Sequence, residues 1–368
     1  MTDTVKNRNH LRHQRNHLSG GLSGMFSGAV RWISLIGILA AVVIVVPGNP
    51  VLASQIRIVT TTSDLADIAG AIAGDLADIT ALSQGNEDPH FLQAKPGFII
   101  QARNADLWIS IGMELEIGWE PAVIHGSRNP RIQVGRPGYL DVSANVLKRG
   151  VPTRRVTRDM GDVHPSGNPH YWLDPWNGRV IAETVADRLS MLFPDRKDVF
   201  HSNLKRFKDE LDRRMFGAAL TESVDGDILW KHQFSGTLDA FIQEQSLPAA
   251  GGWYADTAPL RGVKMVTFHK SWEYFTGRFG MSVVAELEPK PGVPPTAAHL
   301  SHVENLMSAN DLTIILQEPF YSRRAADRVA RNTGATVVVA AGSVSGTPEA
   351  TDYFSIFDLL IAALTNQQ

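Results

Sequence analysis

The stretch DRKDVFHSNLKRFKDELDRRMFGAAL, residues 195–220, separates two blocks of short β-rich runs. Its apolar residues recur every three to five positions, at Val199, Leu204, Phe207, Leu211 and Met215, and charged residues fill the remaining faces. This spacing predicts one long amphipathic helix. Because most of its surface is polar, the helix suits a bridge between two lobes, and it therefore decides how the rest of the chain is interpreted.

The β-rich runs on either side of this helix alternate with helix-compatible stretches. The first block contains IRIVTTTS (56–63), ADITAL (77–82), ADLWISIG (105–112) and RIQV (131–134). The second block contains VKMVTF (263–268), SVVAEL (282–287), LTIILQ (312–317) and TVVVAA (336–341). Two such blocks predict an α/β protein with two open, Rossmann-like lobes, not one large barrel. The expected domains are an N-terminal α/β lobe (54–194), the linker helix (195–220) and a C-terminal α/β lobe (221–368).

Residues 1–53 have the layout of a secretory signal peptide. Basic residues lead into the apolar run ISLIGILAAVVIVV (33–46), and PGNPVLAS (47–54) supplies the small residues of a cleavage site. The apolar run is shorter than the roughly 20 residues that a membrane span needs. We therefore expect cleavage after Ala53 and export to the periplasm, with an uncleaved membrane anchor as the alternative.

Composition and motifs exclude several kinds of site. The 368 residues include no cysteine, which excludes disulfides, thiolate metal ligands, a cysteine nucleophile and a lipid-anchored cysteine. A formal net charge of -3 provides no basic field for nucleic acid. HExxH, G-x-S-x-G, P-loop and dinucleotide-binding patterns are also absent from the sequence. We expect a monomer that is free in the periplasm and does not bind nucleic acid.

Three histidines fall where an open α/β sheet would place a ligand site. His90 lies in GNEDPHF after the run ADITAL, and His269 directly follows VKMVTF. His170 lies in the turn GNPHYWLDP, where the helix start at Asp174 fixes the backbone just after it. Ligands in open α/β sheets bind beyond the carboxyl ends of the strands. Each histidine taken alone is also compatible with a surface or core role, but three in this arrangement favour a metal site.

Five segments together resemble the metal-binding solute receptors of zinc and manganese ABC importers, the ZnuA/TroA-like cluster A-I family. They are GNEDPHFLQAKP, ADLWISIGMELEIGWEP, GNPHYWLDP, TFHKSWEYFTGRFGM and AELEPKPGVPP. The resemblance implies two α/β lobes joined by one long rigid helix, with a metal ion in the cleft between the lobes. It also implies three metal ligands, His90 and His170 from the first lobe and His269 from the second.

The third ligand bears on the choice of metal. In the family, manganese receptors tend to have a carboxylate at this position and zinc receptors a histidine, so His269 implies zinc. Imidazole suits zinc, whereas manganese prefers oxygen donors. We expect capture of Zn(II) and delivery to an ABC transporter permease with its ATPase, with a periplasmic zinc chaperone as a further candidate partner. The alternatives are a manganese receptor of the same family and a three-histidine zinc hydrolase with Glu87 as general base.

The fourth ligand departs from the family pattern. Many relatives have an aspartate just after the last strand, but the corresponding residues here read VVVAAGSVSG (337–346). Zinc is usually four-coordinate, so a water or a carboxylate is expected to complete the site. The main candidate is Glu318, which follows LTIILQ, and the others are Glu87, Asp88 and Asp352. Glu318 has an alternative role as the ion-pair partner of Arg323 or Arg324.

The loop TRDMGDVHPSGNPHYW, residues 157–172, carries Asp162 and His164 a few positions before His170. Its glycine and proline content is typical of an irregular segment. We interpret it as a candidate capture loop that guides zinc into the cleft. The alternative is a solvated loop in which His164 is incidental.

Overall fold

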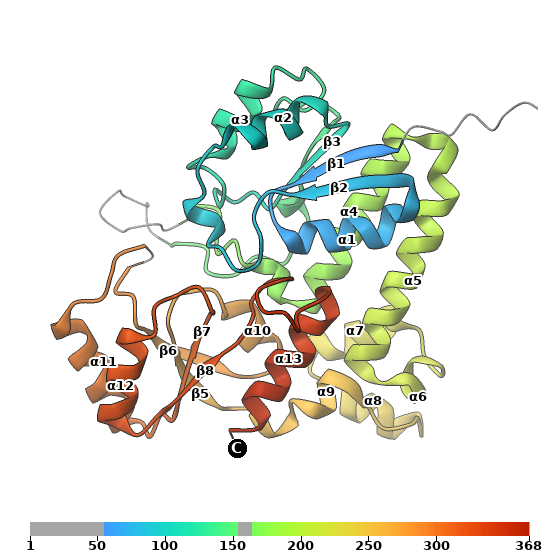
Figure 1. Ribbon diagram of the computed structural model, residues 1–368. Helices are drawn as coiled ribbons and strands as arrows, with labels where there is room; N and C mark the ends of the chain where they lie inside the picture. Colours follow the sequence, from blue (N-terminus) through green and yellow to red (C-terminus); the bar gives the residue numbers. More distant parts are fainter. Residues whose placement is uncertain (1–54, 154–163, 291, 368) are drawn as a thin grey trace, which may run out of the picture. The chain divides into compact units, whose positions relative to one another are not determined.

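The computed structural model describes residues 55–153, 164–290 and 292–367 (Figure 1). One parallel sheet contains β1 (Ile56–Thr60), β2 (Ala77–Ala81), β3 (Leu107–Ser110) and β4 (Tyr139–Asp141). A second parallel sheet contains β5 (Lys264–Thr267), β6 (Ser282–Glu286), β7 (Ile314–Gln317) and β8 (Thr336–Val339). The predicted two-lobed α/β class is therefore confirmed. The signal peptide predicted for residues 1–53 lies outside the described residues.

Both sheets have the same topology. The strand order is β2-β1-β3-β4 in the first and β6-β5-β7-β8 in the second. In each sheet the chain first adds a strand on one side of its starting strand and then continues on the other side. The loops that leave β1 and β3, and those that leave β5 and β7, therefore flank a topological switch point at the carboxyl edge, where ligands bind in such sheets.

Helices cover both faces of the first sheet (Figure 1). The helices are α1 (Ser63–Ala73), α2 (Pro96–Asn104), α3 (Glu120–Ser127) and α4 (Pro175–Leu192). Successive residues of β1 point to opposite faces, so Ile58 packs in the core that includes α1 and α4, whereas Val59 packs in the core that includes α2 and α3. Burial on both faces explains why β3 is buried at every residue and appears in the sequence as a continuous apolar run.

The second sheet is covered in the same way. Its helices are α10 (Glu273–Arg278), α11 (Ala297–Ala309), α12 (Arg324–Thr333) and α13 (Tyr353–Thr365). On β5, Val266 packs in a core with residues of α11 and α12, whereas Met265 joins the large core that includes α13. No helix in the described ranges is long and apolar enough to cross a membrane.

One strand prediction is wrong, because the fourth strand of the first sheet is Tyr139–Asp141 and not residues 131–134. Ile132 is buried as a strand residue would be, but the backbone around it turns. Asn129 Oδ1 accepts the backbone N–H of Arg131 at 3.0 Å, and Gly135 has a φ of +81°. Only after this turn does the chain pair with β3.

The predicted linker helix is α5 (Lys197–Phe216). It ends at Gly217, whose φ is +84° and where a Cβ would lie 2.9 Å from the backbone of Gly251. Phe207, Leu211 and Met215 are buried as their spacing indicates, although the predicted apolar position Val199 is exposed. The helix packs on α1 and α4 of the first lobe.

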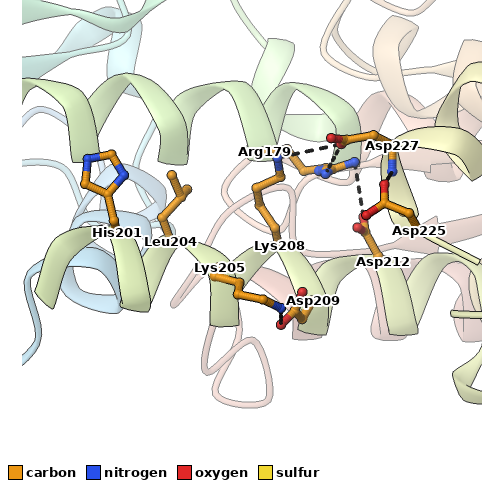
Figure 2. Close-up of a pocket in the computed structure, with 10 residues that line it drawn as sticks. Arg179, His201, Leu204, Lys205, Lys208, Asp209, Asp212, Asp225 and Asp227 are labelled. Atoms are coloured by element: carbon orange, nitrogen blue, oxygen red, sulfur yellow. Dashed lines mark hydrogen bonds and ion pairs between the residues drawn. The ribbon is translucent and has the colours of Figure 1, made fainter. Parts of the chain in front are cut away.

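Short helices α6 (Ala218–Thr221), α7 (Gly226–Phe234), α8 (Leu238–Glu244) and α9 (Gly252–Asp256) follow the linker. The guanidinium of Arg179 on α4 forms ion pairs with Asp212 on α5 at 3.4 Å and with Asp227 on α7 at 2.5 Å (Figure 2). Arg179 also lies over the rings of Trp176 and Trp230. The buried Arg179 guanidinium therefore connects α4 to the linker helix α5 and to α7 beyond it.

Candidate metal centre

The structure brings His90, His170 and His269 together at the carboxyl edges of the two sheets. One nitrogen from each lies within 4.8 Å of the others. The three residues are 7%, 6% and 4% exposed, and their ring centroids are 5.2 to 5.4 Å apart. Two of the rings come from the loops of the first sheet and one from the end of β5, so the cluster draws on both lobes.

His90 and His170 are held by the same local device. Each lies two residues after a residue whose side chain ends in an acceptor oxygen, in the sequences Asp88-Pro89-His90 and Asn168-Pro169-His170. The Oδ1 atom of Asp88 or Asn168 accepts the backbone N–H of its histidine at 3.0 Å and the ring Nδ1–H at 2.8 Å. Because Nδ1 is engaged as a donor in both rings, Nε2 is the nitrogen that carries a lone pair toward a metal.

His269 reaches the cluster from the second sheet. Its Nδ1 donates to Glu288 Oε2 at 2.6 Å, and both side chains are buried. Glu288 stays in place because its backbone N–H donates to the carbonyl of Phe268 at 3.0 Å, beside the end of β5. A carboxylate that accepts the second N–H of a histidine fixes the ring and makes its other nitrogen a better metal donor.

The electrostatic environment differs between the imidazoles. Burial lowers the pKa of His170 well below its usual value, and the nearby His90 and His269 lower it further. Burial also lowers the pKa of His269, but the hydrogen bond to Glu288 and the charges of Glu318 and Asp88 outweigh this effect, so the net shift is upward. The cluster therefore combines a ring that stays neutral with one that is polarised by carboxylates.

The predicted fourth-ligand residues lie in different places. Glu318 is 3% exposed and its Oε2 has no hydrogen-bond partner within the described part of the chain, but it is not one of the residues whose ligand atoms lie mutually within 4.8 Å. Asp88 orients His90, and Asp352 caps α13 by accepting from Ser355. Among the described residues no ion pair joins Glu318 to Arg323 or Arg324, and Arg323 pairs with Asp327 instead.

His164 is the residue whose position the sequence conveyed least. It is buried, and its ring centroid is 5.3 Å from that of His90. Burial and the neighbouring His90 and His269 lower its pKa to about 3. The other residue of the predicted capture loop, Asp162, lies outside the described residues. The only sequence signal for His164 was its separation of six residues from His170, which does not determine where the side chain points.

Two parallel α/β lobes that together enclose a histidine cluster define a metal-binding receptor of the two-lobed type. A family described as "Zinc-uptake complex component A periplasmic" matches residues 58–215 and 239–367. The chain belongs to this family. Its members are solute-binding proteins and not enzymes, which rules out the hydrolase alternative.

Relatives with different stated metals match the chain. The "High-affinity zinc uptake system protein ZnuA" of Yersinia pestis is 22% identical over 298 residues, which are 77% of this chain and 82% of that protein. The "Manganese ABC transporter substrate-binding lipoprotein PsaA" of Streptococcus mitis is 29% identical over 162 residues, 43% of this chain. The match spans 49% of the length of that manganese protein.

Solved structures share the fold. A crystal structure of ZnuA superposes with a TM-score of 0.63 at 22% identity, covering 85% of this chain and 99% of that one. A manganese-bound periplasmic metal-binding protein from Candidatus Liberibacter asiaticus gives a TM-score of 0.61 at 19% identity, covering 85% of this chain and 99% of that chain. These structures establish the arrangement of helices and strands. The identity of the bound metal has to be inferred from the ligand residues of the site.

Proposed function

We propose that the protein is a periplasmic receptor that captures Zn(II) and delivers it to an ABC transporter permease with its ATPase. The observation that carries the proposal is the meeting of three imidazoles whose Nδ1 atoms are all engaged by Asp88, Asn168 and Glu288. One nitrogen from each ring lies within 4.8 Å of the other two. Nitrogen donors suit zinc better than manganese, which prefers oxygen.

The proposed ligands are His90, His170 and His269, and the candidate for the fourth position from the sequence is Glu318. Because His269 belongs to the second lobe, a bound ion favours the arrangement in which both lobes contribute. The transporter would then recognise that arrangement. A manganese receptor of the same family is the competing candidate, since it is favoured by the stated metal of the streptococcal relatives.

A competitive titration of the metal-free protein with zinc and manganese tests the proposal. We expect one tight zinc equivalent that excess manganese does not displace, and loss of this binding in His269→Ala. The matched control is His302→Ala, which removes an exposed histidine on α11. Equal or tighter manganese binding would identify a manganese receptor. Unchanged zinc binding by His269→Ala would overturn the proposed site.

Delivery is tested separately from capture. In the native organism, cells that lack the gene should take up labelled zinc more slowly under zinc limitation. Wild-type protein should restore uptake and His269→Ala should not. If both genes restore uptake equally, capture at this cluster is not part of the delivery route.

A further inference from the structure

His164 adds a fourth buried imidazole beside the three-histidine cluster. It is 8% exposed, and its Nε2 has no hydrogen-bond partner among the residues that the structure describes. Leaving a buried polar nitrogen without a partner is unfavourable, so such an atom favours a ligand that would pair with it. The backbone of Met113 lies close enough to the ring to oppose part of the downward shift of its pKa. His164 therefore offers a buried ring nitrogen beside the cluster that is available to a ligand.

The rings of His90, His170 and His269 have the spacing of metal ligands, and His164 lies at the same spacing from His90. A tetrahedral centre with Zn–N bonds of about 2.0–2.1 Å places the centroids of Nε2-bound imidazoles roughly 5.2 Å apart. The three pairs within the cluster are at 5.2, 5.3 and 5.4 Å, and His164 lies 5.3 Å from His90. Since His164 is outside the group of nitrogens within 4.8 Å of one another, its side chain has to turn inward to complete the tetrahedron.

The backbone that carries His164 is held in a tight turn. The N–H of Gly167 donates to the carbonyl of His164 at 3.2 Å, and the hydroxyl of Ser166 donates to Glu114 Oε1 at 3.0 Å. Gly167 has a φ of +114°, and a Cβ there would lie 2.9 Å from the carbonyl oxygen of Arg149. A backbone held by these contacts lowers the entropy cost of adding this ligand.

Glu318 is the competing donor, and like His164 it lies outside the group of ligand atoms within 4.8 Å of one another. Its Oε2 has no hydrogen-bond partner within the described residues, and its side chain lines a small cavity with His170 and Ser271. His164 differs in that its ring centroid lies 5.3 Å from that of His90, with an interplanar angle of 42°.

We propose that His164 is the fourth ligand, so that the centre binds zinc through four imidazole nitrogens. This inference rests on the proposed function and specifies its ligand set. The missing carboxylate of the last-strand loop is then replaced by a neutral nitrogen donor. Asp88 and Glu288, which accept hydrogen bonds from two of the rings, supply the negative charge that balances the ion. A set of four nitrogens without a coordinating oxygen disfavours manganese.

Long-range ¹H–¹⁵N correlation spectra of the histidine side chains test the ligand count in the intact protein loaded with one equivalent of zinc. We expect four metal-bound Nε2 resonances in wild type and three in His164→Gln. The variant should bind zinc at least tenfold more weakly. Two matched variants serve as controls, namely His302→Ala, which removes an exposed histidine, and Glu318→Gln, which removes the competing carboxylate. Both should retain four metal-bound resonances.

The outcomes separate this inference from the proposed function. Three metal-bound resonances in wild type, with none lost in His164→Gln, would overturn the role of His164 while leaving the three-histidine receptor intact. If Glu318→Gln then lost affinity tenfold, the carboxylate would be the fourth ligand. Unchanged zinc binding by His269→Ala would instead contradict the proposed function itself.

Discussion

The hydroxyl of Tyr321 donates to Asp88 Oδ2 at 3.0 Å, while the other oxygen of the same carboxylate, Oδ1, accepts the Nδ1–H of His90 at 2.8 Å. Tyr321 lies beyond β7 in the second lobe, and Asp88 and His90 belong to the first. Asp88, which orients the ring of His90, is thus itself held by a residue of the second lobe. Orientation of His90 and contact between the lobes are therefore linked through one carboxylate.

Tyr321→Phe should speed zinc release because Asp88 loses its contact with the second lobe while His90 keeps its acceptor. We expect dissociation to be roughly tenfold faster, in the range seen when groups behind metal ligands are altered. Stopped-flow chelator competition measures the rate. Tyr254→Phe, which removes a hydroxyl bonded to Asp239 on the surface, is the control. Equal release rates in the two variants would show that Tyr321 does not act through Asp88.

Asn168 has the equivalent role for His170. Its Oδ1 accepts two N–H groups of His170, and its Nδ2 donates to the carbonyl of Lys270 at 2.8 Å and to Glu273 Oε2 at 3.2 Å. Asn168→Ala removes both sets of bonds, so zinc affinity should fall about 10–100-fold. Isothermal titration measures the change. Asn145→Ala, at an exposed position of the same lobe, should bind as wild type does, and an Asn168→Ala variant that matched it would contradict this role.

The architecture and the three histidines were predictable because they depend on local and periodic signals. Alternating β/α runs fix parallel sheets, and strand ends fix where loops meet. The Asp88-Pro89-His90 and Asn168-Pro169-His170 turns are also local, since each acceptor lies two residues from its histidine. The spacing of the apolar residues predicted the linker helix, which ends at Gly217, within four residues of the predicted boundary at 220.

What the sequence did not determine depends on contacts between distant segments. Tyr321 and Asp88 are 233 residues apart, and no local pattern pairs them. The position of His164 is of the same kind, because only the packing brings its ring within 5.3 Å of that of His90. The missed strand β4 has three residues, too few to show a period, and a buried Ile132 in a turn imitated it.

Asp64 makes stability depend on pH. Its carboxyl lies at the start of α1 and accepts the N–H of Val344 from the other lobe at 2.9 Å, and burial raises its pKa from 3.8 to about 7. The folded state therefore retains a proton that the unfolded chain loses above pH about 4. The resulting stabilisation is complete below the unfolded pKa and is lost as pH rises through about 7.

Asp64→Asn should remove this dependence. At about 1.4 kcal/mol per pKa unit, the free energy of unfolding of wild type should fall by on the order of 4 kcal/mol between pH 4 and 7 relative to the variant. Urea unfolding of the metal-free protein at several pH values measures the difference. Asp75→Asn, at an exposed acid nearby, should keep the wild-type slope. Parallel pH profiles for wild type and Asp64→Asn would contradict the assignment.

The buried Arg179 should contribute most to the stability of the packing between α4, α5 and α7 (Figure 2). Arg179 is 3% exposed, and its removal leaves Asp212, which also accepts from Trp230 Nε1 at 2.7 Å, as an uncompensated buried charge. Arg179→Met should therefore lower the free energy of unfolding by about 3–5 kcal/mol, and Arg179→Met with Asp212→Asn should recover part of the loss.

Urea unfolding of the metal-free variants measures both effects. Lys205→Ala, which breaks the exposed pair with Asp209 drawn in the same view, should leave the unfolding midpoint unchanged. If Arg179→Met unfolded at the same urea concentration as Lys205→Ala, the ion pairs of Arg179 would contribute no net stability. If the double variant were less stable than Arg179→Met, the cost would come from lost packing against Trp176 and Trp230 and not from the unpaired carboxylate.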